Sequence, residues 1–219
     1  MIRMAENDKI IEAVEGFVKG VVTGHDSGHG WSHIERVVRL ALHIHDIEKT
    51  GNRLIIELGA LLHDVGDHKF ATHDGPAEIR KLLINLEVDE EIINEVVSIN
   101  ERISFSKGDH HSFKSDELKI VQDADRLDAM GAIGIARAFN YGGFKGREIY
   151  DPKVRYVNPG NFEAGRSAST GTVNHFYEKL LLLKNLMNTT TGIKLAEERH
   201  AFMVRYLEQF YREWDPGDR

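Results

Sequence analysis

Apolar residues recur along this chain at spacings of three and four, the period of an α-helix that buries one face. Alternating runs bounded by hairpin turns, the pattern of β-strands, are hard to find. The pattern predicts an all-α fold, a helical bundle with two additional helices at the C-terminal end. The clearest helical stretches are residues 6–22, 34–49, 90–103, 172–187 and 195–214.

Local signals predict where several helices begin. Ser32 and Glu35 have the spacing of a capping box. Asp74 precedes a Gly-Pro pair, which is typical of a helix start, and Asp89 is a candidate N-cap. The apolar spacing over 116–141 predicts one long helix, stopped by the two glycines that follow it.

Residues from about 144 to 170 lack helical periodicity, and we interpret them as a loop or lid. The whole chain, 1–219, is interpreted as a single domain, with a metal-binding core of about 20–140 and C-terminal helices over about 171–214. These last helices either pack on the domain or pair with a second subunit. The sequence leaves the oligomeric state open, and a homodimer is one alternative.

The most apolar stretch, "LIIELGALL" at 54–62, is followed directly by His63 and Asp64. His33 begins another predicted helix, and Asp125 lies within the acidic segment "QDADRLDAM". Each residue alone has an ordinary interpretation: an exposed helix residue, a hydrogen-bonded helix end, or a solvated charged face. Together they form a set of two imidazoles and two carboxylates from three helices. Such a set suits a divalent cation that keeps open positions for water and a phosphate oxygen.

The energetics of burial favour the metal interpretation of this set. Burying Asp64 and Asp125 without compensation would cost several kcal/mol, and a bound cation removes that cost. The chain contains no cysteine, which excludes disulfides, thiol catalysis and cysteine-based zinc sites. Any metal must therefore be held by nitrogen and oxygen.

Composition narrows the class of protein further. With 41% hydrophobic and 29% charged residues, the chain has the composition of an ordinary globular protein. A formal charge of -7 argues against a broad nucleic-acid-binding face, because such faces neutralise phosphates with Lys and Arg. The apolar runs are too short to span a bilayer, and the first residues resemble an amphipathic helix more than a signal segment. We therefore expect a cytoplasmic protein with neither a nucleic-acid nor a membrane partner.

The segments "HIERV" from His33, "LLHD" ending at Asp64 and "QDADRLDA" around Asp125 resemble the HD-domain superfamily of metal-dependent phosphohydrolases. That family has a histidine, a later His-Asp pair and a final aspartate, which falls here on Asp125 rather than Asp123. The resemblance covers nearly the whole chain. It is closer to small proteins similar to nucleotide pyrophosphohydrolases, because "ISFSKG", "IYDP" and "LAEERHAFM" look like that branch.

The resemblance implies an HD-domain helical bundle and one divalent metal ion held by His33, His63, Asp64 and Asp125. Mn²⁺ or Mg²⁺ is expected, with Ni²⁺, Co²⁺, Fe²⁺ and Zn²⁺ as alternatives. The implied activity is hydrolysis of a small phosphorylated substrate, a nucleoside or deoxynucleoside triphosphate, to the monophosphate and pyrophosphate. The alternatives are an HD-type phosphodiesterase or 5′-nucleotidase, and a regulatory module that binds metal or nucleotide without turnover.

Several neighbours of the ligands are candidates for the chemistry. Asp67 lies roughly where related phosphohydrolases carry a carboxylate that orients the attacking water, and His68 is a candidate acid for the leaving oxygen. Arg126 is a candidate phosphate clamp, because a guanidinium binds phosphate through two parallel hydrogen bonds. Lys69 and Lys107 are further cationic candidates for the substrate. All five also have ordinary interpretations, as turn, loop or ion-pair residues.

Two further expectations concern the surroundings of the ligands. Asp128 lies three residues after Asp125, where it would orient a histidine or an arginine. A second metal ion would need more imidazoles, for which His110 and His111 are the candidates. We expect a single ion.

Overall fold

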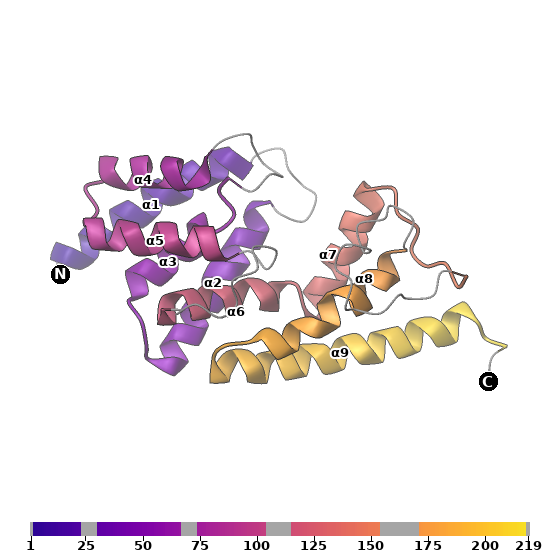
Figure 1. Ribbon diagram of the computed structural model, residues 1–219. Helices are drawn as coiled ribbons and strands as arrows, with labels where there is room; N and C mark the ends of the chain where they lie inside the picture. Colours follow the sequence, from indigo (N-terminus) through magenta and orange to yellow (C-terminus); the bar gives the residue numbers. More distant parts are fainter. Residues whose placement is uncertain (1, 23–29, 67–73, 104–114, 154–170, 218–219) are drawn as a thin grey trace. The chain divides into compact units, whose positions relative to one another are not determined.

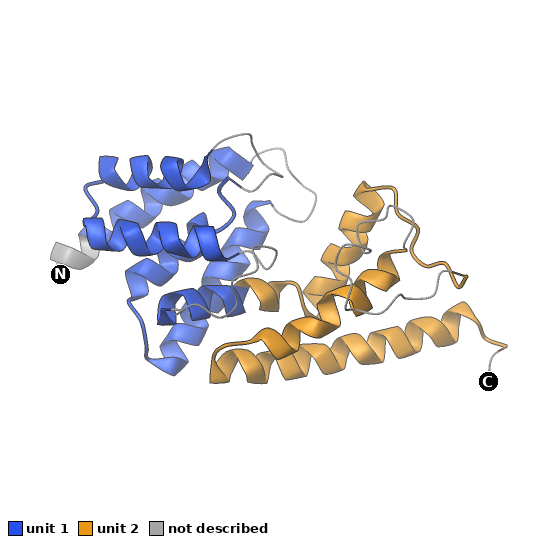
Figure 2. Cartoon of the chain, in the orientation of Figure 1, with its two compact units in different colours: residues 1–124 blue, residues 125–219 orange. Residues whose placement is uncertain are grey.

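The computed structural model describes residues 2–22, 30–66, 74–103, 115–153 and 171–217 (Figure 1). These residues form helices and irregular connections, with no strand among them, so the predicted all-α class is confirmed. They fall into two compact units, Met1–Ala124 and Asp125–Arg219 (Figure 2). The boundary lies inside helix α6 (Asp116–Asp128). That the chain folds as a single domain stays a prediction.

The first unit is built around a short apolar helix, α3 (Arg53–Leu62). It contacts three longer helices: α1 (Ile2–Val22), α2 (Trp31–Glu48) and α5 (Glu90–Arg102). Helix α4 (Gly75–Asn85) packs on α5 from the other side. Every α3 residue from Ile55 to Leu62 is buried except Glu57. Each large apolar side chain buried in this way contributes about 1.5–3 kcal/mol, so the end of α3 is held firmly.

Two predicted helix starts show different outcomes. Asp74 is the N-cap of α4, where its side chain accepts a hydrogen bond from the Ala77 amide at 3.3 Å, as predicted. The capping box at Ser32 and Glu35 is wrong. Helix α2 begins at Trp31, two residues before the predicted start at His33, with Gly30 as its N-cap and no side-chain hydrogen bond at the cap. Ser32 therefore lies inside the first turn.

Helix α3 has a cap of its own. The Asn52 side chain accepts a hydrogen bond from the Leu54 amide at 3.0 Å, and the Asn52 amide donates to Glu117 of α6 at 2.7 Å. Asp89 occupies the N-cap position of α5 but makes no side-chain hydrogen bond there. The start of α3 is thus fixed by its own cap and by a contact from α6.

The second unit continues from the end of α6 through α7 (Gly131–Phe144), α8 (Thr172–Glu178), a 3₁₀ helix (Leu180–Leu186) and α9 (Thr190–Trp214). The long C-terminal helix α9 contacts both α7 and the 3₁₀ helix. The core of the second unit includes the fully buried Phe176 and Met203. The two predicted C-terminal helices are present, but the first is divided into α8 and the 3₁₀ helix.

The single helix predicted over 116–141 is also divided, because the chain leaves the helical conformation between α6 and α7. Met130 is extended, with φ -119° and ψ 166°, and Gly131 has a φ of +68°. A left-handed residue cannot continue an α-helix, and glycine adopts that conformation without a side-chain clash. Met130 is buried, so core packing holds the break in place.

The structure describes only the first part of the loop predicted over about 144–170. Residues 145–153 contain no helix, and 154–170 lie outside the described part of the chain. None of the described helices is both long and apolar enough to cross a bilayer.

His175 in α8 gives the second unit a predictable acid sensitivity. Burial, together with the nearby charges of Lys179 and Arg147, lowers the pKa of His175 from 6.5 to about 4. Between these pH values His175 is therefore protonated in the unfolded chain but not in the folded chain. The free energy of unfolding falls as the pH drops through this window. We expect a loss of about 2 kcal/mol between pH 7 and pH 5.

Urea unfolding at the two pH values, followed by Trp214 fluorescence in a Trp31→Phe background, measures this loss. The His175→Gln variant should lose most of the acid sensitivity. His43→Gln, which changes an exposed histidine of α2, is the matched control and should keep it. Equal acid sensitivity in the two variants would assign the effect to other groups.

Candidate metal centre

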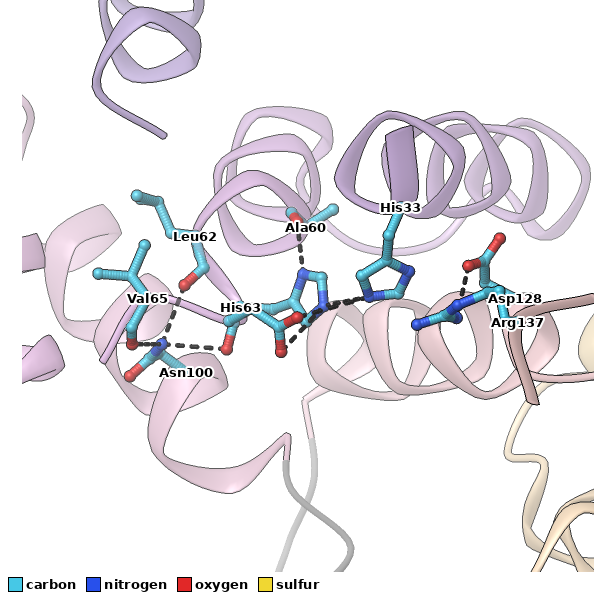
Figure 3. A network of polar contacts seen from close by, with 9 residues as sticks. His33, Ala60, Leu62, His63, Val65, Asn100, Asp128 and Arg137 are labelled. Atoms are coloured by element: carbon cyan, nitrogen blue, oxygen red, sulfur yellow. Dashed lines mark hydrogen bonds and ion pairs between the residues drawn. The ribbon is translucent and has the colours of Figure 1, made fainter. Parts of the chain in front are cut away.

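Three of the predicted ligands converge in the first unit. His33 comes from the first turn of α2, and His63 and Asp64 follow the last turn of α3. The two histidines are almost fully buried, with exposed fractions of 2% and 3%. Figure 3 shows the two imidazoles side by side, and their rings are arranged edge to face. One ligand atom from each of the three residues lies within 4.8 Å of the others.

The distances within this cluster are those of atoms that can share one ion. The two Nε2 atoms are 3.3 Å apart. Nε2 of His33 lies 3.5 Å from Oδ2 of Asp64, and Nε2 of His63 lies 3.5 Å from Oδ1 of the same carboxylate. Ligands about 2.1 Å from a common metal lie roughly 3.0 Å apart along an octahedral edge and roughly 3.4 Å apart along a tetrahedral one. The separation of the two Nε2 atoms falls in this range, and the separation of each imidazole from its nearest Asp64 oxygen is close to it. Its nitrogen and carboxylate donors fit a divalent cation of the hard or borderline class.

The orientation of His63 is set by a backbone contact. Its Nδ1 lies 2.8 Å from the carbonyl oxygen of Ala60, one turn earlier in α3 (Figure 3). A carbonyl only accepts hydrogen bonds, so Nδ1 carries the proton and donates it. The lone pair of Nε2 then faces His33 and Asp64, which is the tautomer that a metal ligand requires.

The turn that carries His63 and Asp64 has a partner that the sequence analysis missed. The Asn100 side chain of α5 lies against the carbonyls of Leu62, His63 and Val65, at 2.9, 3.1 and 3.0 Å (Figure 3). A signal for it was present: Asn100 falls four residues after Val96 and seven after Ile93, in the apolar stripe of its helix. A polar residue in that stripe indicates a buried contact.

The remaining predicted residues of α6 belong to the second unit. Asp125 begins that unit, and its part in metal binding stays a prediction from the sequence. Arg126 is buried, and its Nη1 donates to the carbonyl of Leu186 at the end of the 3₁₀ helix. This hydrogen bond links α6 to the 3₁₀ helix within the second unit. The contact of Arg126 with phosphate stays a prediction.

Asp128 meets an arginine, as the sequence analysis expected. Its Oδ2 lies 2.7 Å from Nη1 of Arg137 in α7, and both side chains are largely buried. Arg199 of α9 donates to the Leu127 carbonyl. Burial lowers the pKa of Arg199, and the negative charge of Asp128 acts in the opposite direction. These contacts fix the end of α6 against α7 and α9.

Four of the predicted catalytic and substrate-binding residues, and both candidates for a second metal, lie outside the described part of the chain. Their roles stay predictions. They are Asp67, His68, Lys69, Lys107, His110 and His111.

Comparison with known proteins identifies the family. Residues 30–130 match the HD domain family. YpgQ of Bacillus subtilis is 37% identical over 94% of this chain and 94% of its own. A crystal structure of an HD-superfamily hydrolase from Bacillus thuringiensis is 43% identical, with a TM-score of 0.76, and covers 95% of this chain and 98% of that one.

One of the similar structures contains a ligand. The crystal structure of Bacillus subtilis YpgQ in complex with ADP is 35% identical, with a TM-score of 0.75, over 94% of this chain and 98% of that one. The family match begins at the start of α2 and ends beyond α6, so it spans every predicted metal ligand. By sequence, by fold and by its His-His-Asp cluster, this chain belongs to the HD-domain superfamily of hydrolases.

Proposed function

We propose that this protein is a nucleotide pyrophosphohydrolase that depends on one divalent metal ion and converts a nucleoside or deoxynucleoside triphosphate to the monophosphate and pyrophosphate. The observation that carries the proposal is the convergence of His33, His63 and Asp64 in a buried part of the first unit. Buried imidazoles facing a carboxylate, with one tautomer fixed, are prepared to bind a cation.

Four residues would hold the ion in this proposal: His33, His63 and Asp64, with Asp125 as the fourth ligand from the sequence pattern. A Mn²⁺ or Mg²⁺ ion there would polarise a phosphoryl group and make an attacking water more acidic. Asp67 would accept a hydrogen bond from that water, and His68 would donate a proton to the leaving oxygen. Arg126, Lys69 and Lys107 would stabilise negative charge on the phosphates.

The choice of a nucleotide as substrate is supported by a relative. YpgQ was crystallised in complex with ADP. The alignment covers nearly all of both chains, so the similarity includes the whole fold and not one segment of it. The resemblance of "ISFSKG" and "LAEERHAFM" to pyrophosphohydrolase-like proteins favours cleavage between the α and β phosphates. The cytoplasmic location expected from the sequence belongs to the same proposal.

The test is a panel of nucleoside triphosphates, monophosphates and cyclic dinucleotides with Mn²⁺, Mg²⁺, Co²⁺ or Ni²⁺, with products identified by mass. We expect monophosphate and pyrophosphate in equal amounts from at least one triphosphate, and no turnover in the presence of a chelator. His63→Ala protein purified in parallel controls for contaminating phosphatases.

Other products would contradict the proposal in distinct ways. Orthophosphate released from a monophosphate would indicate a 5′-nucleotidase, and hydrolysis of the cyclic dinucleotides alone would indicate a phosphodiesterase. Binding of metal and nucleotide without any product would indicate a regulatory module.

A further inference from the structure

We propose that Asn100 is a positioning residue for the metal centre: its side-chain amide fixes the turn that presents His63 and Asp64. This inference rests on the proposed function, because it concerns the same cluster. Asn100 is 8% exposed and belongs to α5, a helix that contributes none of the predicted ligands.

The contact adds a side-chain donor to the carbonyls at a helix end, where Leu62 also accepts a hydrogen bond from the Val65 amide at 3.1 Å. The last carbonyls of an α-helix have no intrahelical donor. At the end of α3 the carbonyls of Leu62, His63 and Val65 all point toward Nδ2 of Asn100, at 2.9, 3.1 and 3.0 Å. One amide therefore binds both the ligand residue His63 and the residues on either side of the ligand pair.

The orientation of the amide follows from its surroundings. Three carbonyl oxygens face it, so the nitrogen must point toward them and the amide oxygen away. The NH₂ group has only two protons, which the three carbonyls must share. The arrangement tolerates little rotation of the turn, because any rotation lengthens at least one of these contacts.

The turn is also in close contact with α4. A Cβ on Gly75, the first residue of α4, would lie 2.3 Å from the Val65 carbonyl oxygen and 2.9 Å from Cα of Gly66. The backbone of α4 therefore packs directly on the turn. Gly66 itself has a φ of +80°, which ends the helical geometry just after the ligands. The turn is therefore in contact with both α4 and the Asn100 amide.

Loss of the amide should change the direction in which the ligands point. Loss of a hydrogen bond to a buried carbonyl is costly, so the turn would rotate to restore donors to the carbonyls that Asn100 contacts. Such a rotation moves His63 and Asp64 together, and it disturbs the 3.5 Å separations between the Asp64 oxygens and the two imidazoles. Metal affinity falls because the ligand atoms no longer converge.

A purely structural role for Asn100 would have a different consequence. The amide would then contribute to stability like any buried hydrogen-bonded group, and the folded protein would bind metal normally. The two roles are separated by measuring metal affinity on folded protein, well below the melting temperature. The control is Val96→Ala, which removes packing one turn earlier on the same face of α5 and leaves the Asn100 amide in place.

The experiment uses full-length protein, with free Mn²⁺ measured by electron paramagnetic resonance during titration. Asn100→Leu should raise the dissociation constant for Mn²⁺ by about 10- to 100-fold, the range found when partners of metal ligands are removed. Asn100→Ser, which keeps one hydroxyl donor, should give a smaller rise. Val96→Ala should lower the melting temperature and leave the Mn²⁺ affinity within about twofold of the parent.

Each result decides between the roles. Equal Mn²⁺ affinities for the parent, Asn100→Leu and Val96→Ala would overturn the positioning role while leaving the proposed function intact. A parent that does not bind Mn²⁺, or that binds it as well after His63→Ala, would overturn the proposed function itself. If Asn100→Leu does not fold, the comparison of Asn100→Ser with Val96→Ala decides.

Discussion

Replacement of His63 by alanine is expected to reduce metal-dependent nucleotide hydrolysis by roughly 10²- to 10³-fold or more. The imidazole supplies one of the converging ligand atoms, and the Ala60 carbonyl holds its Nε2 in the direction of the cluster. Alanine removes the ligand and leaves the ion to the other three residues of the proposed set, His33, Asp64 and Asp125. The same variant should lose the rise in melting temperature that Mn²⁺ gives the parent by binding the folded state.

The matched control is His43→Ala, which removes an exposed histidine from α2. It should keep both the activity and the metal-dependent shift. Circular dichroism of His63→Ala must show a folded protein, because His63 is buried. A folded His63→Ala variant with parental activity would contradict the assignment of His63 as a ligand. Asp64→Asn, which keeps the shape and removes the charge, should show the same losses.

The largest effect on stability is expected from the core of α3. Ile56 is fully buried, and Ile56→Ala should lower the free energy of unfolding of the first unit by about 2–5 kcal/mol. The cost combines the lost transfer of apolar surface out of water with the cavity left behind. Against a total stability of roughly 5–15 kcal/mol, the loss is large.

The chain offers a control with the same substitution. Ile47 of α2 is 54% exposed, so Ile47→Ala should change stability by less than about 0.5 kcal/mol. Of the two tryptophans, Trp31 lies in the first unit and Trp214 in the second. Urea unfolding followed by Trp31 fluorescence in a Trp214→Phe background therefore reports on the first unit. Equal losses for the two isoleucine variants would contradict the central place of α3.

The sequence was sufficient where local chemistry decides the structure. The apolar run at 54–62 and the cap at Asp74 appear in the structure as α3 and the start of α4. It was insufficient where tertiary packing decides. Nothing in the apolar spacing over 116–141 indicates that Met130 would be buried in an extended conformation beside a left-handed Gly131. At the start of α2, the spacing of Ser32 and Glu35 suggested a cap that the helix does not use.

The candidate site divides in the same way. The proximity of His33 to His63 and Asp64 was expected from residue types and from the family pattern, and these residues do lie together. The support from Asn100 was not expected, because its importance depends on which carbonyls α5 faces after folding. A contact between residues 35 or more positions apart leaves no local trace beyond one polar residue in an apolar stripe.

The burial of α3 also decides how the protein should behave without its ion. In small metal-dependent domains such as zinc fingers, binding and folding are one event, and chelation unfolds the chain. Here the turn that presents His63 and Asp64 is anchored to a helix that is buried against three others. We therefore expect the apoprotein to keep a preformed site, and an ion bound there to exchange without unfolding of the chain. A single preparation of the protein, once its metal has been removed with a chelator, should then be suitable for reconstitution with each metal separately.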